Sequence, residues 1–282
     1  MNKLALLGVV VMVACQADNR NLEKKIEDLT KSVNDLKTQI GRGGIGAQMP
    51  QRPARAEPDR AKTYAIQIEG DPSEGPADAK VTLVKAYDYL CPFCERVRGT
   101  MDDLRKKYGN DLRIVYKQLV VHPPVATIGA LAACAAHKQG KFLEMDKLLW
   151  DQGYNGHQLQ KDGSENSGKC YEADAGCPTM LSFAQQLGLS ADKFKADMKG
   201  ECLQLVQKDQ HELAAFGVGA TPAFFVNGRY MVGAMPIDNF ATLIDEELKK
   251  ANDAIAAGTP AASYYQQVVL DKGLKQLDRP VQ

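Results

Sequence analysis

Two cysteines separated by two residues, Cys91-Pro92-Phe93-Cys94, constrain this chain more than any other feature of it. They follow an apolar run at 81–87 and open a stretch whose apolar side chains recur on one face of a helix (Val97, Met101, Leu104 and Tyr108). Backbone amides and the dipole at a helix start favour a thiolate. Pro92 suits the first helical position, where its missing N–H costs nothing. A second sulfur one turn into the helix is close enough for a reversible disulfide, so the pair predicts thiol–disulfide exchange.

A pair of cysteines at this spacing also serves as half of a zinc site. Such sites usually bring a second pair of Cys or His ligands. The sequence offers no second pair of this kind, and its four histidines, at 122, 137, 157 and 211, are scattered. We therefore predict redox chemistry that needs no metal and no cofactor, with a zinc site as the alternative.

The two cysteines of the motif are expected to have different roles. Cys91, at the helix start, should be exposed and attack, with Cys94 as its buried partner. A stabilised thiolate both attacks and leaves well, and a lower thiol pKa makes the disulfide more oxidising. Phe93 supplies no charge and no hydrogen-bond donor. We therefore expect the pKa of Cys91 to be low for a thiol but less low than in the strongest oxidants.

The first residues point to export from the cytoplasm. Lys3 precedes an apolar run at 4–14, which is shorter than the roughly 20 residues that span a bilayer and is typical of a signal peptide. Met12-Val13-Ala14-Cys15 resembles the lipobox of bacterial lipoproteins, which implies that Cys15 is acylated and tethers the chain to a membrane. Secretion with cleavage after Ala17 is the alternative. Gln16 after the cysteine favours the outer membrane under the Gram-negative sorting pattern.

The composition agrees with a compartment outside the cytoplasm and limits the classes of partner to expect. The chain is 44% apolar and 25% charged over 282 residues, as in an ordinary globular protein. Seven cysteines in a chain of this size indicate an oxidising compartment. The formal net charge is zero, which gives no reason to expect a nucleic-acid partner.

Residues 22–40 carry a heptad pattern. Apolar positions alternate at spacings of four and three, with branched side chains at a and leucines at d (Ile26, Val33 and Ile40; Leu22, Leu29 and Leu36). This combination favours a parallel two-stranded coil. The segment therefore predicts a short coiled-coil stalk that makes the protein a homodimer. A stalk that packs on its own domain is the alternative.

The domain boundaries follow from changes in composition. Residues 41–62 contain Gly, Pro and Arg without a hydrophobic period, which predicts a flexible linker. The expected order is a lipoprotein signal peptide at 1–14, a lipidated and coiled-coil segment at 15–40, this linker, and one folded domain at 63–282.

The first part of that domain alternates strands and helices. Strands are predicted at 64–68, 81–87 and 112–117, and the helix of the cysteine pair lies between the last two. Residues 123–215 then show helical patterns and no convincing strand. This region is expected to be an inserted block of helices.

The last part contains a hairpin and closing helices. Apolar runs at 223–226 and 229–232 flank Asn227-Gly228, a strong signal for a tight β-hairpin. An amphipathic helix is predicted at 237–250 and a further helix at 260–277. The complete order is that of an α/β thioredoxin fold with a helical insertion at about 123–215.

Three stretches resemble the DsbA-like thiol–disulfide oxidoreductases: GPADAKV at 75–81, YDYLCPFC at 87–94 and GVGATPAFFVNG at 217–228. The resemblance covers about residues 64–250. It implies that the Thr221-Pro222 bond is cis, faces the cysteine pair, and frees the preceding backbone to pair with an extended client. A proline at 222 also fits a strand start, where no ladder donor is lost.

Lys85 departs from the resemblance. It lies six residues before Cys91, where DsbA-like proteins often carry a buried Glu that handles the proton of the inner cysteine. A lysine acts as a base only if desolvation lowers its pKa, and otherwise favours a thiolate by Coulomb attraction. If Lys117 is its neighbour, one ammonium must turn outward or find a carboxylate such as Asp88 or Glu95. An exposed lysine at the strand end is the alternative.

Four further cysteines lie in the helical block, at 134, 170, 177 and 202. Four cysteines allow three pairings, and the sequence does not choose among them. Cys170 and Cys177 are near enough for a local bridge, which leaves Cys134 with Cys202. We expect these cysteines to be structural, because neither member of such a pair opens a helix as CxxC.

These observations together predict an exported, membrane-tethered enzyme that forms or shuffles disulfides in client proteins. Cys91 forms a mixed disulfide with the client and Cys94 resolves it. The resemblance implies that a monomeric oxidant would be recharged by a DsbB-like membrane partner, whereas a coil-linked dimer suits an isomerase. The alternatives are a reductase of extracytoplasmic disulfides and a non-catalytic binding module on a lipoprotein stalk.

Overall fold

A computed structural model describes residues 23–35, 37–38, 57–164 and 168–277. The chain divides into two units, residues 1–55 and 56–282. In the first unit, residues 23–35 form a helix on which Ile26, Leu29 and Val33 are exposed. Cys15 and the other heptad positions (Leu22, Leu36 and Ile40) lie outside the described residues, so the lipid anchor and the coiled coil stay predictions.

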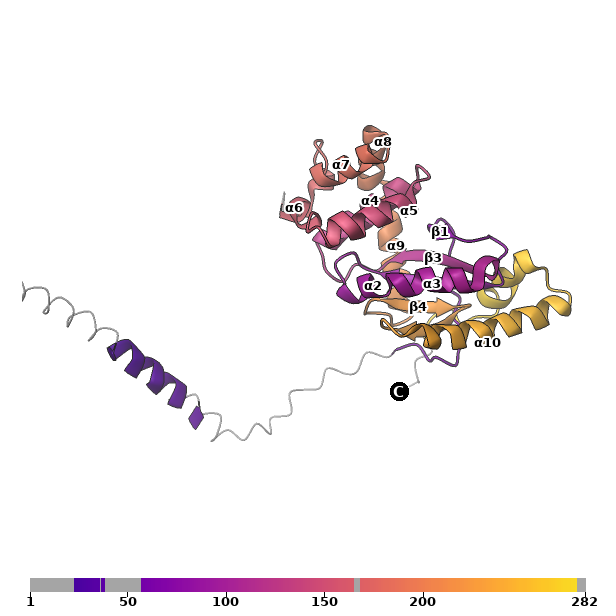
Figure 1. Cartoon of the computed structure of the whole chain (residues 1–282), viewed down its shortest axis with the longest axis horizontal. Coiled ribbons are helices and arrows are strands. Elements are labelled where there is room, and N and C mark those ends of the chain that lie inside the picture. Colours follow the sequence, from indigo (N-terminus) through magenta and orange to yellow (C-terminus); the bar gives the residue numbers. More distant parts are fainter. Residues whose placement is uncertain (1–22, 36, 39–56, 165–167, 278–282) are drawn as a thin grey trace, which may run out of the picture. The chain divides into compact units, whose positions relative to one another are not determined.

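The second unit is built on a five-stranded sheet with strand order β1-β3-β2-β4-β5 (Figure 1). The strands are β1 Ser73–Glu74, β2 Val81–Tyr87, β3 Leu112–Gln118, β4 Ala223–Val226 and β5 Arg229–Val232. β2 and β3 are parallel, and the other pairs are antiparallel. Asn227 and Gly228 join β4 to β5, and both have positive φ, as a tight hairpin of this kind requires.

The central strand β2 is buried along its whole length, because both faces of the sheet are covered. Helices α2 Pro92–Arg96, α3 Arg98–Tyr108 and α10 Ile237–Ala256 belong to the core on one face. The other face carries a separate apolar cluster. The side chains of successive β2 residues point to opposite faces of the sheet. Leu83 therefore packs in the first cluster and Val84 in the second.

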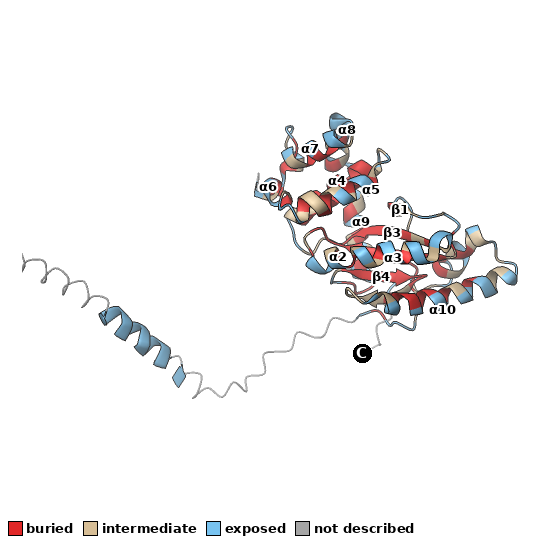
Figure 2. Ribbon diagram, in the orientation of Figure 1, coloured by how far each residue is buried: buried red, intermediate tan, exposed pale blue. Residues whose placement is uncertain are grey.

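A block of helices separates β3 from β4 (Figure 1). It consists of α4 Val125–His137, α5 Phe142–Leu148, η2 Leu149–Tyr154, α6 Leu159–Ser164, η4 Cys170–Glu172, α7 Pro178–Gln186, α8 Ala191–Lys199 and α9 Glu201–Ala215. The alanine-rich helix α4 is almost wholly buried at its centre (Figure 2). The predicted pairs Cys134–Cys202 and Cys170–Cys177 are confirmed as disulfides.

Two elements of the structure differ from those that the sequence predicts. Residues 64–68 form no strand, since Thr63 and Tyr64 make only isolated bridges to Arg229 and Leu274. Their buried side chains pack on the sheet face instead of entering its ladder. The predicted helix at 260–277 is shorter and irregular: it consists of the turn η5 Ala261–Ser263 and the π-helical turn η6 Tyr265–Leu270.

Within the part of the chain that the structure describes, no helix combines the length and the apolar character that a membrane crossing needs.

Candidate active site

The cysteine pair lies at the start of α2, directly after the buried strand β2. Cys91 is the N-cap residue with extended backbone, and Pro92 follows at the first helical position. Both cysteines are free thiols. Cys94 has no exposed surface, and Cys91 is only 3% exposed. The prediction of an exposed Cys91 is therefore wrong for the free protein.

The segment before β4 explains the low exposure of Cys91. The Thr221-Pro222 peptide is cis, as expected. In its protonated form the Cys91 thiol donates a hydrogen bond to the Thr221 carbonyl oxygen at 3.3 Å, so this segment lies against the sulfur. Phe93 is instead 49% exposed, with the guanidinium of Arg96 5.1 Å from its ring centre. Pro92 and Phe93 are thus the exposed residues of the motif, and both of its cysteines are buried.

The two thiols have opposite pKa shifts. A hydrogen bond from the Cys94 thiol lowers the pKa of Cys91 to about 5, against the effect of burial and with further contributions from the Thr221 side chain and the backbone amides of Cys94 and Phe93. Burial raises the pKa of Cys94 well above its ordinary value. At neutral pH Cys91 is a thiolate and Cys94 a thiol. The predicted acidity agrees, because about 5 lies between an ordinary thiol, about 8.5, and the most acidic such cysteines, about 3.5.

Lys85 is 2% exposed, on the face of β2 that α3 covers. Its ammonium lies 4.9 Å from the ring centre of Tyr87 and 5.5 Å from that of Tyr116. Burial lowers the pKa of Lys85. The alternative of an exposed lysine at the strand end is wrong, because this strand is central and covered on both faces.

Lys117 is not a neighbour of Lys85. The parallel register sets Tyr116 opposite Lys85, so the side chain of Lys117 points to the other face of the sheet. It is fully buried there with three carboxylates (Asp71, Asp209 and Glu212, at 2.7, 2.7 and 3.0 Å). One of the two lysines was expected to turn outward or to find a carboxylate, and Lys117 does find carboxylates. They are not the examples given, Asp88 and Glu95.

Asp88 instead fixes the loops around the cysteine pair. Its buried carboxylate accepts hydrogen bonds from the backbone N–H groups of Leu90, Val121 and His122 at 2.7, 2.6 and 2.9 Å. The Cys91 N–H donates to the backbone carbonyl oxygen of Asp88 at 3.1 Å. Asp88 thus joins the cysteine loop to the connection between β3 and α4. Sequence reasoning missed this role, although an Asp directly after a strand is a common turn residue.

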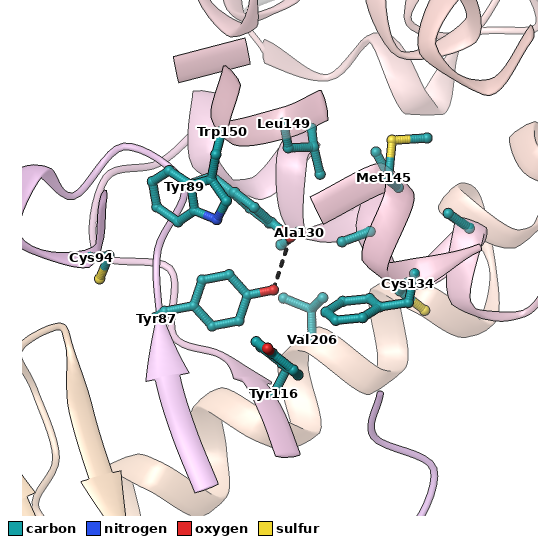
Figure 3. Packing of buried hydrophobic residues seen from close by; sticks show 14 of the residues in the cluster. Tyr87, Tyr89, Cys94, Tyr116, Ala130, Cys134, Met145, Leu149, Trp150 and Val206 are labelled. Atoms are coloured by element: carbon teal, nitrogen blue, oxygen red, sulfur yellow. Dashed lines mark hydrogen bonds between the residues drawn. The ribbon is translucent and has the colours of Figure 1, made fainter. Parts of the chain in front are cut away.

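Polar contacts run from the inner side of the pair into the helical block. The Tyr87 and Tyr89 hydroxyls are hydrogen-bonded at 2.9 Å, and Figure 3 shows both rings beside Trp150. Tyr89 also donates to Asp146 of α5 at 2.7 Å. The Gln118 amide donates to the Tyr87 hydroxyl at 2.8 Å. Asp146 had no sequence signal, because only the fold brings α5 to this strand.

One trio of side chains among the described residues has the spacing of a metal site: Asp162, Cys170 and Cys177. Its two sulfurs already form a disulfide, so they are not available as thiolate ligands. Cys91 and Cys94 belong to no such trio within the described residues.

Comparison with known proteins identifies the family of this chain. The Thioredoxin family model matches residues 67–246, more than half of the chain. The Na⁺/H⁺ antiporter NhaA of Herminiimonas arsenicoxydans is 33% identical over 170 residues, which cover 60% of this chain and 24% of that protein. NhaA 1 of Salinispora arenicola is 33% identical over 185 residues, 64% of this chain and 25% of that protein. The chain spans about a quarter of the length of the curated relatives it matches.

Two solved structures show the same fold. Oxidised BdbD from Bacillus subtilis is 21% identical with a TM-score of 0.52, covering 69% of this chain and 100% of that one. Alpha-DsbA1 from Wolbachia pipientis is 15% identical with a TM-score of 0.54, covering 67% and 96%. The predicted α/β thioredoxin fold with an inserted helical region is thereby confirmed.

Proposed function

The chain belongs to the thioredoxin family, as a DsbA-like thiol–disulfide oxidoreductase, and from that premise we propose that it forms or shuffles disulfides in exported client proteins. One observation carries the proposal: the pKa of Cys91 is lowered to about 5 beside a buried Cys94 thiol. A stable Cys91 thiolate stabilises the reduced enzyme, and this makes the Cys91–Cys94 disulfide a better oxidant.

The oxidising cycle has two exchange steps. A client thiolate attacks the Cys91 sulfur, the bond to Cys94 breaks, and Cys94 leaves with the electron pair. A second client thiolate then attacks the client sulfur of the mixed disulfide and releases the Cys91 thiolate. The client loses two electrons and the enzyme gains them, so an external oxidant must restore the pair. We assign that recharging to a DsbB-like membrane partner.

The supporting residues have proposed roles that follow from their places. The Thr221 carbonyl lies over the sulfur, so it is placed to accept a hydrogen bond from an extended client once the mixed disulfide has formed. Pro222 keeps that backbone free of the β-ladder. Pro92 starts the helix that stabilises the thiolate. Phe93 offers an exposed apolar contact to the client.

Exchange with a reduced two-cysteine peptide tests the proposal. Oxidised protein at equal concentration is expected to consume the peptide thiols, and Cys91→Ser is expected to consume none. Lys107→Met, an exposed change on α3, is the matched control and should react as the wild type does. A non-catalytic binding module would still bind the peptide but would leave its thiols unchanged in every variant. A reductase would instead leave this peptide reduced and open an oxidised one.

Export and membrane attachment form a second part of the proposal. The signal peptide at 1–14 and an acylated Cys15 would tether the enzyme, with the outer membrane favoured. Two disulfides in the helical block agree with an oxidising compartment outside the cytoplasm. The Cys15→Ala variant is expected to leave the membrane fraction. If this variant still sediments with membranes, the lipid anchor is wrong.

The direction of exchange depends on the oligomeric state. We propose that residues 22–40 form a coil that joins two copies, which would hold two active sites around one client and suit an isomerase. The exposed Ile26, Leu29 and Val33 support this, since a solitary helix gains nothing from such a face. Sedimentation of residues 19–282 and 41–282 tests it. If the two chains contain the same number of copies, the coil does not make a dimer, and a monomeric oxidase is favoured.

A further inference from the structure

The two disulfides of the helical block have different surroundings. Cys170 and Cys177 are 7 positions apart in the sequence, and at most 1% of either residue is exposed. A carboxylate oxygen of Asp162 lies within 4.8 Å of both sulfurs. Negative charge at that distance repels an approaching thiolate, and burial blocks its path. The Cys170–Cys177 bridge is therefore protected from attack by a thiol.

The other disulfide, Cys134–Cys202, joins α4 to α9 across 68 positions of the sequence. Cys202 is fully buried, whereas Cys134 is 5% exposed. Of this pair, Cys134 is the residue that lines a surface pocket of about 720 Å³. A molecule that enters the pocket therefore meets Cys134 and not Cys202.

The pocket lies between the end of α4, the first turns of α9 and the loop before β1. Its volume is in the range of sites for small molecules, so a low-molecular-weight thiol fits and a folded client does not. In its wall Lys138 pairs with Glu201, and Glu69 and Lys208 add one charge of each sign. Burial lowers the pKa of His137, which keeps this ring neutral at pH 7. The wall thus carries no net charge that would repel an anionic thiol.

The two sulfurs also differ as leaving groups. Cys202 is the second residue of α9, where the backbone amides of the helix start favour a thiolate, although burial opposes this. Lys138 pairs with the neighbouring Glu201 and offsets the negative charge beside the sulfur. Cys134 lies in the last turn of α4, where the helix dipole disfavours a thiolate. Helix polarity therefore favours Cys202 as the leaving group and leaves Cys134 as the sulfur that is attacked.

We propose that Cys134–Cys202 is a thiol-sensitive bridge, opened by a low-molecular-weight thiol that enters this pocket. The thiolate attacks the Cys134 sulfur, the bond to Cys202 breaks, and Cys202 leaves with the electron pair. Cys202 then takes up from water the proton that the thiol lost on ionising. Return of Cys202 expels the small thiol and closes the bridge again. A second small thiolate instead releases Cys134, so that the bridge gains two electrons and the small thiols become their disulfide.

The fold can survive this opening, because α9 has a second attachment. Its Asp209 and Glu212 lie 2.7 and 3.0 Å from the buried ammonium of Lys117 in β3. These ion pairs hold α9 on the sheet whether the bridge is closed or open. The bridge therefore responds to a thiol in the folded protein, and its opening is measurable without unfolding.

Peptide mapping after treatment with reduced glutathione tests the proposal. The full chain with Cys91→Ser and Cys94→Ser is used, so that the proposed redox pair takes no part. The oxidised, folded protein is incubated with excess glutathione, alkylated and digested. We expect glutathione on Cys134 and the alkyl label on Cys202. The Cys170–Cys177 bridge should open at least about tenfold more slowly, because exchange depends on access to the sulfur.

Two substitutions on α9 test the route of attack. Gln204→Trp places a larger side chain in the pocket wall and should slow opening of the bridge about tenfold by covering the Cys134 sulfur. Gln207→Trp is the matched control: it is exposed on the same helix but outside the wall, and should stay within about twofold of the unsubstituted rate. Thermal melting of each variant checks that it is folded.

The bridge does not depend on exchange at Cys91, so failure of the proposed function leaves this inference in place. The inference is wrong if glutathione leaves the Cys134–Cys202 bridge closed, or if glutathione is found on Cys202. It is also wrong if both bridges open at one rate, because opening then goes through unfolding. Equal rates for Gln204→Trp and Gln207→Trp would show that the thiol does not enter by the pocket, and would overturn it as well.

Discussion

Two helices of this protein start in the same way and carry cysteines of opposite character. Cys91 and Cys177 are both N-cap residues with extended backbone, and each is followed by a proline at the first helical position, in α2 and α7. Cys91 is a free thiol in the redox pair, whereas Cys177 is bonded to Cys170. A cysteine and proline at a helix start therefore do not by themselves make a reactive site.

The difference lies in what occupies the first amides of each helix. In α7 the N–H groups of Thr179 and Met180 donate to the buried carboxylate of Asp162 at 2.9 and 3.0 Å. In α2 the amides of Phe93 and Cys94 instead lower the pKa of the Cys91 sulfur. At the start of α7 the Asp162 carboxylate accepts the hydrogen bonds of the first amides. At the start of α2 the negative group near the first amides is the Cys91 thiolate.

The largest expected effect comes from substituting the two helix-starting cysteines, Cys91 and Cys177, one at a time. Cys91→Ser should abolish exchange with a reduced client, because without Cys91 the pair has no disulfide for the client thiolate to attack. Cys177→Ser should leave the exchange rate within about twofold while lowering the free energy of unfolding by about 2–3 kcal/mol, the expected loss for a short disulfide loop. Assays of client thiols measure the exchange rate, and denaturant unfolding measures the free energy of unfolding. Loss of exchange in folded Cys177→Ser would break the comparison.

The pH dependence of Cys91 is the next largest effect. Its folded pKa lies near 5, below the ordinary thiol value of about 8.5, so the thiolate stabilises the reduced protein. That stability is fully present above about pH 8.5 and is lost as pH falls through 5. The melting temperature of the reduced protein should therefore rise, relative to the oxidised protein, from pH 5 to 8.5. Alkylation of Cys91 should be half-maximal near pH 5, and a midpoint near 8.5 would contradict this.

A smaller change should follow from Phe93→His. A histidine beside the sulfur adds a charge that the exposed phenyl ring cannot supply, so the pKa of Cys91 should fall further. A tenfold gain in the stability of the reduced form corresponds to about 30 mV of reduction potential. We expect a shift of about that size toward a more oxidising pair. Phe93→Leu is the matched control, and an equal shift there would show that charge is not the cause.

The smallest effect on exchange is expected for Asp162→Ala. The substitution frees two amides at the start of α7 and should lower the free energy of unfolding by about 1–2 kcal/mol, as for loss of a helix cap. The potential of the Cys91–Cys94 pair should stay the same, because Asp162 caps a different helix. A changed potential would show that the two helix starts are coupled.

The sequence was sufficient wherever a property is local. The CxxC spacing, the apolar run that forms β2 and the Asn-Gly hairpin each depend on a few adjacent residues, and the structure has all three. The cis bond at Pro222 came from the family resemblance. The segment at 64–68 misled because its buried side chains reflect packing on the sheet and not a place in the ladder.

Properties set by distant residues could not be read in this way. Cys91 is covered by Thr221, which lies 130 positions away, so its low exposure had no local signal. The environment of Lys85 depends on a helix of the insertion that carries Asp146. Whether Lys117 is a neighbour of Lys85 was left open by the sequence, and the strand register sends the two to opposite faces.

The reduction potential of the Cys91–Cys94 pair tests the central claim most directly. Equilibration with a series of glutathione mixtures, followed by alkylation and mass measurement of the free thiols, gives its value. A thiolate as stable as that of Cys91 predicts a potential of about −120 to −180 mV, the range of oxidants and isomerases. A value near −270 mV, as in thioredoxin, would mean a reductase, and a pair that never oxidises would contradict the account altogether.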